Sequence, residues 1–160
     1  MKESIRKYLP SFVYGGSDGT VTTFAVMAGA VGAGIDTRIV LILGLANLVS
    51  DGFSMASADY LAEDSRKGEN KSTVLKNSLV TFFSFITIGL IPILPVIFAA
   101  KEKQFALSAL FTLAAFASIG YLRAYILKRN RILLALQSVA IGSICAFLAY
   151  VVGVYVSKLV

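Results

Sequence analysis

Long apolar runs, separated by short polar breaks, dominate this sequence. A helix needs about 20 consecutive apolar residues to cross the hydrocarbon core of a bilayer. Inside a membrane the backbone must satisfy its own hydrogen bonds, and a helix does so within one segment. The sequence therefore predicts an all-α integral membrane protein with five transmembrane helices, at about 15–34, 39–61, 77–100, 104–127 and 132–157.

The composition limits the chemistry that the chain can perform. Of its 160 residues 57% are hydrophobic and 15% are charged, whereas soluble domains have about 45–50% and 25%. Histidine is absent and Cys145 is the single cysteine, which excludes histidine metal sites, cysteine clusters and Ser-His-Asp catalysis. We therefore expect that the protein is not an enzyme and that it binds no permanent cofactor.

The basic residues are distributed unequally between alternate polar breaks. Eleven Lys and Arg residues lie in the N-terminal segment, in 62–76 and around 123–131, against four in the other breaks. The positive-inside rule then places the N-terminus in the cytoplasm and the C-terminus outside or in a lumen. The short loops favour a prokaryotic inner membrane. Because the basic clusters lie beside the spans, no nucleic-acid partner is expected.

Three segments indicate local structure outside the predicted spans or at their ends. Residues 1–14 are expected to form an amphipathic cytoplasmic lead, with Pro10 and Ser11 as a turn and cap before the first span, and no cleavable signal peptide. Residues 62–76 predict a short cytoplasmic loop. Pro92 and Pro95 lack a backbone N–H, so the third span should bend or end near the outer surface.

Three acidic residues, Asp18, Asp51 and Asp59, fall inside the apolar runs. An ionised side chain at the centre of a spanning helix costs roughly 2.5–3.5 kcal/mol, so each acid suggests a function. Positions 47, 51, 55 and 59 advance by four residues, which places Asn47, Asp51, Met55 and Asp59 on one stripe about 18 Å long.

These five residues form a donor set that suits a divalent first-row metal. Carboxylate and amide oxygens bind hard or borderline ions, while a thioether favours a softer ion such as Fe²⁺ over Mg²⁺ or Ca²⁺. The carboxylates can also take up protons when the metal leaves, which allows metal/proton exchange. Alternatively, Asn47 and Asp51 hydrogen-bond between helices and Met55 fills a gap in the core.

Asp18 lies in a glycine-rich stretch, Tyr14-Gly-Gly-Ser-Asp-Gly-Thr20. Glycines permit close backbone approach, or an opened turn whose carbonyls are available to an ion. The alternative is an Asx turn or N-cap at the start of the first span. In the cytoplasmic segment, Glu63 and Glu69 could collect cations at the mouth of a pathway, or simply balance the neighbouring basic residues.

The first run also contains a stripe of small residues. Ala25, Gly29 and Ala33 repeat at four-residue spacing. Such stripes let helices approach closely in lipid. The stripe supports helix association without specifying the partner helix.

Two stretches, GGSDGTVTTFAV at 15–26 and GLANLVSDGFSMA at 44–56, closely resemble the signature segments of the vacuolar iron transporter family. Residues 89–95 and 140–153 also resemble that family's third and fifth spans, so the resemblance covers nearly the whole chain. Founding members carry a glutamate-rich metal-binding domain between spans two and three. The short segment 62–76 has no room for it, so the role of that domain is not carried over.

The resemblance implies a five-span homodimer in which the first spans of both chains line a central path. It implies export of cytosolic Fe²⁺, and often Mn²⁺, as a transported substrate in exchange for protons. Asp18 matches the family's first-span aspartate and Met55 its second-span methionine. Asn47 and Asp51 occupy polar positions of the same segment, and Asp59 stands where many members have glutamate.

The expected partners are thus a second copy, membrane lipid, the metal and protons. Two other functions stay open. In a non-transporting scaffold or assembly subunit, the carboxylates would serve helix association. Changing both of them to Asn would then cause no loss of a metal-dependent phenotype. In a passive cation channel, flux would not depend steeply on an opposing proton gradient.

Overall fold

The computed structural model describes residues 2–66, 70–156 and 158–159, and within these ranges all regular secondary structure is helical. The prediction of an all-α protein is therefore confirmed. The elements in chain order are α1 (Lys2–Gly32), α2 (Thr37–Asp64), α3 (Lys71–Gly89), the 3-10 helix η1 (Ile91–Ile93), α4 (Leu94–Phe98), α5 (Lys101–Leu127) and α6 (Arg131–Val156).

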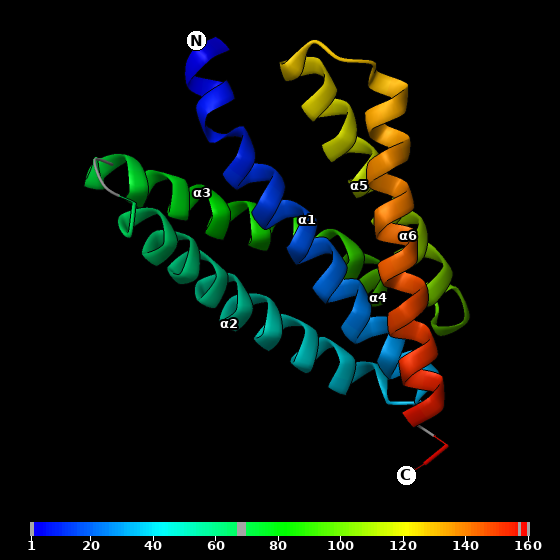
Figure 1. The fold of residues 1–160 in the computed structure, drawn as a ribbon. Helices are drawn as coiled ribbons and strands as arrows, with labels where there is room; N and C mark the ends of the chain where they lie inside the picture. Colours follow the sequence, from blue (N-terminus) through cyan, green and yellow to red (C-terminus); the bar gives the residue numbers. More distant parts are fainter. Residues whose placement is uncertain (1, 67–69, 157, 160) are drawn as a thin grey trace.

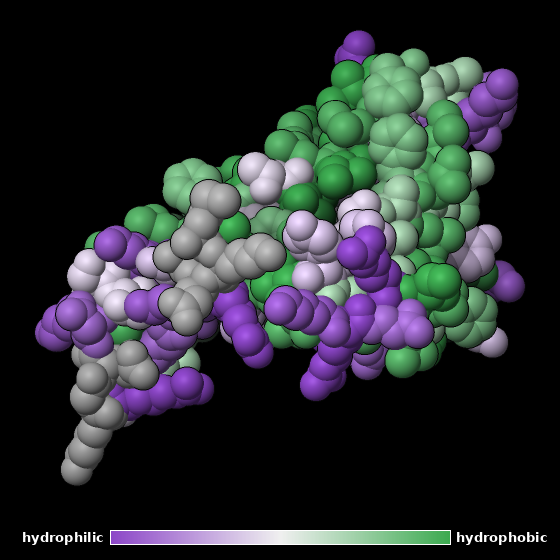
Figure 2. All heavy atoms as spheres, turned by 90° about the horizontal axis from the view of Figure 1, so that it is seen from above, coloured by the Kyte–Doolittle hydropathy of each residue, from purple (hydrophilic) through white to green (hydrophobic). Residues whose placement is uncertain are grey.

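The helices run back and forth between two ends of the molecule (Figure 1). The start of α1, the α2–α3 connection and the α5–α6 turn lie toward one end, which we call the amino end. The α1–α2 turn, the α4–α5 connection and the end of α6 lie toward the other, the carboxyl end. Figure 2 looks onto the amino end and shows patches of hydrophilic side chains there, beside broad hydrophobic surfaces.

Four described segments are long and apolar enough to cross a membrane: α2, the stretch from Lys71 to Phe98, α5 and α6. Large hydrophobic side chains such as Ile42, Phe53 and Ile132 are exposed on them, as expected for surfaces that face lipid. These findings support an integral membrane protein. Helix α1 is not among the four segments, because glycines, threonines and Asp18 lower its hydropathy, so the fifth span stays a prediction.

Helix α1 is the element around which the others pack. It contacts α3 most extensively, and it also contacts α6, α5 and α2. Glycines explain the closeness of α1 and α3: a Cβ atom at Gly15 would collide with the carbonyl oxygen of Thr81, and one at Gly19 with that of Phe85. The two backbones are in direct contact, which small residues at a helix interface make possible.

The first helix differs from the prediction. A turn and cap at Pro10 and Ser11 was expected, but α1 runs without interruption from Lys2 to Gly32 with Pro10 inside it. Proline removes one backbone hydrogen bond from a helix. Leu9 and Ser11 on either side are buried, and this packing offsets the lost bond, so the helix continues.

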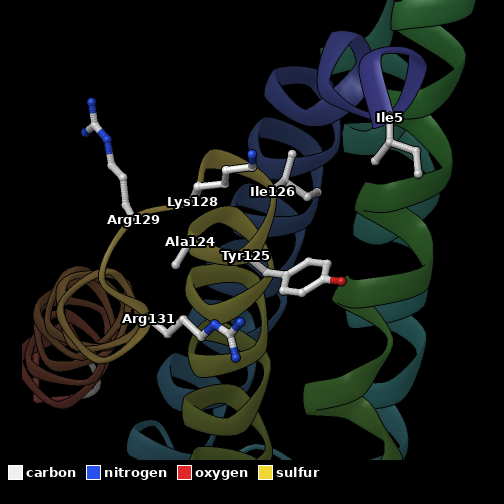
Figure 3. A pocket seen from close by; sticks show the side chains of 7 residues that line it. All are labelled: Ile5, Ala124, Tyr125, Ile126, Lys128, Arg129 and Arg131. Carbon is white, nitrogen blue, oxygen red and sulfur yellow. The ribbon is translucent and has the colours of Figure 1, made fainter. Parts of the chain in front are cut away.

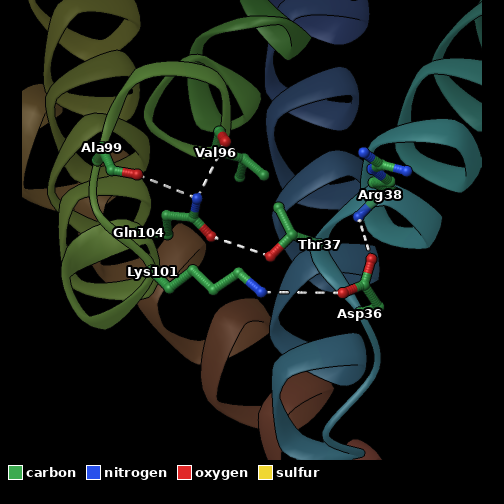
Figure 4. A network of polar contacts seen from close by, with 7 residues as sticks. All are labelled: Asp36, Thr37, Arg38, Val96, Ala99, Lys101 and Gln104. Atoms are coloured by element: carbon green, nitrogen blue, oxygen red, sulfur yellow. Dashed lines mark hydrogen bonds and ion pairs between the residues drawn. The ribbon is translucent and has the colours of Figure 1, made fainter.

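The prolines of the third span act as predicted. Helix α3 ends at Gly89, and the chain continues through η1 and α4, which contain Pro92 and Pro95. Two prolines three residues apart remove two of the N–H groups that would continue the helix, which favours a break here. Polar contacts then hold this region, because the Gln104 amide donates to the carbonyl oxygens of Val96 and Ala99, at 3.1 Å each (Figure 4).

At the carboxyl end, the α1–α2 turn contacts the connection between α4 and α5. Asp36 caps α2 by accepting from the Arg38 N–H at 2.9 Å, and it pairs with Lys101 Nζ at 3.9 Å (Figure 4). Thr37 donates to the Gln104 side-chain oxygen at 3.4 Å. Beneath these contacts lies an apolar core of Met27, Ala30, Val40 and Val96. The four helices α1, α2, α4 and α5 are thereby fixed together at this end.

The glycine packing of α1 leads to a stability prediction. In an open helix, changing Gly to Ala would stabilise by about 1 kcal/mol. At Gly15 the new methyl meets the backbone of α3, and overpacking costs about 1–3 kcal/mol. We expect Gly15→Ala to lower the free energy of unfolding, measured by SDS titration in detergent micelles.

Gly16→Ala is the matched control. Its Cβ would lie 3.3 Å from Ile88 Cγ1, a side-chain atom that can move, so little loss of stability is expected. Equal effects of the two substitutions would contradict the direct contact between the α1 and α3 backbones.

Candidate metal site

The predicted polar stripe of α2 lies next to the packed face of that helix. Asn47, Asp51, Met55 and Asp59 are all half-buried. The adjoining face is fully buried and consists of Val40, Gly44, Leu48, Gly52 and Ala56. A Cβ atom at Gly52 would lie 3.1 Å from the Phe85 ring, so α2 also approaches α3 closely. The stripe therefore lies along the edge of the helix interface and not deep in the core.

Asp18 lies in the middle of α1, where the helix is uninterrupted. The glycine-rich stretch therefore forms neither an opened turn nor an N-cap, and both of those expectations are wrong. The physical reason is the packing against α3, which uses the glycines for close approach and keeps the backbone helical. In the single chain the Asp18 side chain is exposed.

The structure brings Asp18 and Asp51 together across two helices. The two carboxylates interact electrostatically, although they are 33 residues apart in the sequence. Two like charges close to one another repel, and a bound cation or proton relieves that repulsion. Binding of a positive ion by this pair stays a prediction.

Asp59 and Glu63, further along α2, bind to α3 instead. Thr81 Oγ1 donates to Asp59 at 2.6 Å, and the Asn77 amide nitrogen lies 2.9 and 2.8 Å from the two oxygens of Glu63. These hydrogen bonds join α2 to α3 near the amino end. Asn77 and Thr81 were not among the predicted site residues, although two polar residues spaced by four on an apolar helix were a usable signal.

Asn47, one turn before Asp51, carries a buried amide nitrogen with no hydrogen-bond partner among the described residues. Leaving such a donor unpaired costs about 1–3 kcal/mol. The Asn47 amide can therefore donate a hydrogen bond to an acceptor that does not belong to this chain. The hydroxyl groups of Thr20, Thr22 and Ser57 instead bond to carbonyl oxygens of their own helices. These three are therefore engaged locally.

In the part of the chain that the structure describes, no group of three or more His, Cys, Asp or Glu residues could hold a metal ion. A single chain thus contributes a carboxylate pair, flanked on α2 by Asn47 and Met55. Glu69, predicted near the cytoplasmic mouth, lies outside the described residues. The roles of all these residues toward a metal stay predictions.

A helical membrane protein with paired acids among its helices belongs to a class in which such acids mark an ion pathway or a proton relay. Comparison with known proteins identifies the family. The sequence model of the VIT family matches residues 9–77 and 66–154. The chain belongs to the VIT family.

Three relatives carry the name vacuolar iron transporter. The protein from Plasmodium berghei is 23% identical over 224 residues, covering 93% of this chain and 82% of its own length. The protein from Toxoplasma gondii is 43% identical over 60 residues, which is 38% of this chain and 20% of the relative. The protein from Plasmodium falciparum is 34% identical over 59 residues, 37% of this chain and 22% of the relative.

The matched part is therefore about a fifth of the Toxoplasma gondii and Plasmodium falciparum proteins. All three relatives come from eukaryotic parasites, so the expectation of a prokaryotic inner membrane gains no support from them.

The hydrogen bond between Thr81 and Asp59 should stabilise the folded protein whether or not Asp59 binds metal. A hydrogen bond to a charged group contributes about 1.5–3 kcal/mol. We expect Thr81→Val to lower the free energy of unfolding by about 1.5–3 kcal/mol, and to have little further effect when Asp59 is already Ala, which has no acceptor. A double-mutant cycle in SDS titrations measures this coupling.

Thr87→Val is the control, because the Thr87 hydroxyl bonds to the Phe83 carbonyl of its own helix. It should change stability by less than about 0.5 kcal/mol. Additive effects of Asp59→Ala and Thr81→Val would show that the bond does not join the two helices.

Proposed function

We propose that this protein transports a divalent transition metal, Fe²⁺ and also Mn²⁺, out of the cytoplasm in exchange for protons. The observations that carry the proposal are the half-buried stripe of Asn47, Asp51 and Met55 on α2, the Asn47 amide, which is unpartnered among the described residues, and the reach of the Asp51 charge to Asp18 on α1. Two carboxylates held close together in an apolar protein need a cation or a proton for charge balance. Metal and protons therefore compete for one site, which is the requirement for exchange.

The neighbouring side chains suit this role. Met55 lies one helical turn from Asp51 and adds a thioether, which favours Fe²⁺ over Mg²⁺ or Ca²⁺. Asn47 lies one turn in the other direction, and its buried amide lacks a partner among the described residues. Asp59 would relay the metal to the central pair from the cytoplasmic mouth, where Glu63 would collect cations, as predicted also for Glu69.

In the proposed orientation, α1 is the fifth spanning helix. Its ends lie at opposite ends of the molecule, as do those of the four apolar segments (Figure 1). The excess of basic residues in the N-terminal segment and in the α2–α3 and α5–α6 connections favours a cytoplasmic amino end. The carboxyl end then faces the outside or a lumen.

A homodimer would complete the site. Helix α1 lies in front of α3, flanked by α2 and α6 (Figure 1). Ala25 and Gly29 follow Asp18 by seven and eleven residues, on the same helical face. The Gly29 backbone packs against Gly153 of α6, but a Cβ atom at Gly29 would meet nothing within 4 Å. A second copy packed on this face would add a second pair of carboxylates, which supplies ligands that one chain lacks.

Transport in proteoliposomes tests the proposal. With an acidic interior, external Fe²⁺ should enter as protons leave, and dissipating the pH gradient should abolish accumulation. Asp18→Asn and Asp51→Asn should each lower the initial rate by about tenfold or more, because the loss of one charged ligand costs roughly 1.4 kcal/mol or more.

Asp64→Asn is the matched control, since Asp64 is exposed at the end of α2 and its change removes the same charge. Unchanged flux in both Asp18→Asn and Asp51→Asn would defeat the site assignment, whereas no Fe²⁺ flux above that of protein-free liposomes would support a scaffold. Flux that persists without regard to the proton gradient would indicate a channel.

Met55 should determine which metals are carried. Met55→Leu keeps the apolar volume but removes the thioether, so we expect Fe²⁺ flux to fall more than Mn²⁺ flux in the same proteoliposomes, because manganese prefers oxygen ligands. An equal fall for both metals would assign Met55 to packing.

The dimer face can be tested by cross-linking. In a Cys145→Ser background, Ala25→Cys should form a disulfide between two copies in native membranes, seen as a dimer on non-reducing gels. Phe53→Cys is the control, because Phe53 is two residues from Asp51 and so lies on the far side of α2. Cross-linking through Phe53→Cys but not Ala25→Cys would place the interface elsewhere.

A further inference from the structure

A cavity of about 440 Å³ lies at the amino end between the start of α1 and the α5–α6 turn (Figure 3). It is remote from the acidic stripe, and its wall is partly apolar and partly cationic. Its lining residues are Ile5, Ala124, Tyr125, Ile126, Lys128, Arg129 and Arg131.

The fold fixes the side chain of one of its cations and the backbone of another. The Arg131 guanidinium lies 5.5 and 5.4 Å from the ring centres of Tyr121 and Tyr125 and donates to the Tyr121 hydroxyl at 3.1 Å. Such stacking restricts a long side chain to one place. Lys128 is the C-cap of α5, with a left-handed φ of 54°, which is uncommon for a residue other than glycine.

Figure 3 shows how these groups surround the cavity. Lys128 and Arg131 approach from different sides of Tyr125, while the Arg129 side chain points away from both. Among the described residues, the ion pair that the structure contains joins Lys101 to Asp36 at the opposite end of the molecule. The cations of the cavity are therefore not neutralised by a described carboxylate, and the cavity suits an anion.

The surroundings indicate which anion. Directly beyond the cavity α6 exposes Ile132 and Leu133, at 72% and 61%, so the cationic groups lie where a lipid-facing surface begins. Basic pockets between helices at the cytoplasmic side of a membrane bind anionic headgroups. We propose that this cavity binds the phosphate group of an anionic phospholipid between Lys128 and Arg131, with the acyl chains along the apolar start of α6.

A zwitterionic lipid would fit less well, because its own cation would meet Lys128 and Arg131. Binding would also tie the start of α1 to the α5–α6 turn through one ligand, since Ile5 forms part of the wall. The proposal is independent of transport: a lipid can occupy this site whether or not the acids of α1 and α2 carry metal.

Native mass spectrometry of the detergent-solubilised full chain tests the site with dioleoylphosphatidylglycerol and dioleoylphosphatidylcholine as probes. We expect one phosphatidylglycerol to bind at least about fivefold more tightly than phosphatidylcholine, as an added basic contact allows. Lys128→Asn should lower phosphatidylglycerol affinity by about fivefold. Asn adopts the left-handed conformation more readily than Lys, so backbone strain would not explain the loss.

Lys158→Asn, which removes the same charge from an exposed position at the carboxyl end, should leave the affinity unchanged. Arg131→Gln provides a second variant, with a loss at least as large as that of Lys128→Asn. Equal affinities for the two lipids, or equal effects of Lys128→Asn and Lys158→Asn, would overturn the proposal. So would displacement of phosphatidylglycerol by equimolar inorganic phosphate, which would identify a free-phosphate site.

Discussion

The direct backbone contact between α1 and α3 is the constraint on which the rest of the structure depends. Helix α1 is too polar to rank with the four strongly apolar segments, and it is stable among them because glycines at 15 and 19 let it pack directly on α3. In lipid, where no hydrophobic force draws helices together, such close packing is a main source of association. The same contact holds Asp18 within electrostatic reach of Asp51.

The polar residues among the helices divide into two groups with different chemistry. Asp59 and Glu63 receive hydrogen bonds from Thr81 and Asn77, so part of the cost of burying these acids is offset by α3. Asp18 and Asp51 interact with each other as like charges. Acids that accept hydrogen bonds from a neighbouring helix stabilise the structure, whereas two acids that repel one another need a bound cation or proton. This contrast is why the central pair, and not the whole acidic stripe, carries the proposed function.

Much of this arrangement could be predicted from local sequence features. The apolar runs indicated helices, the two prolines indicated the break before α4, and the four-residue spacing placed Asn47, Asp51 and Met55 on one side of α2. The errors occurred where a local signal competed with packing. Pro10 suggested a helix start, and the glycines around Asp18 suggested an opened turn, but burial against α3 keeps α1 helical through both.

The sequence by itself determined the class of protein, the membership of the VIT family and the side of each helix on which the polar residues lie, because helical periodicity is a local property of the backbone. The tertiary structure decided which acid meets which partner: Asp51 meets Asp18, while Asp59 and Glu63 meet α3. That choice depends on how closely whole helices approach one another. Contacts between residues far apart in the chain determine it, and no local pattern specifies them.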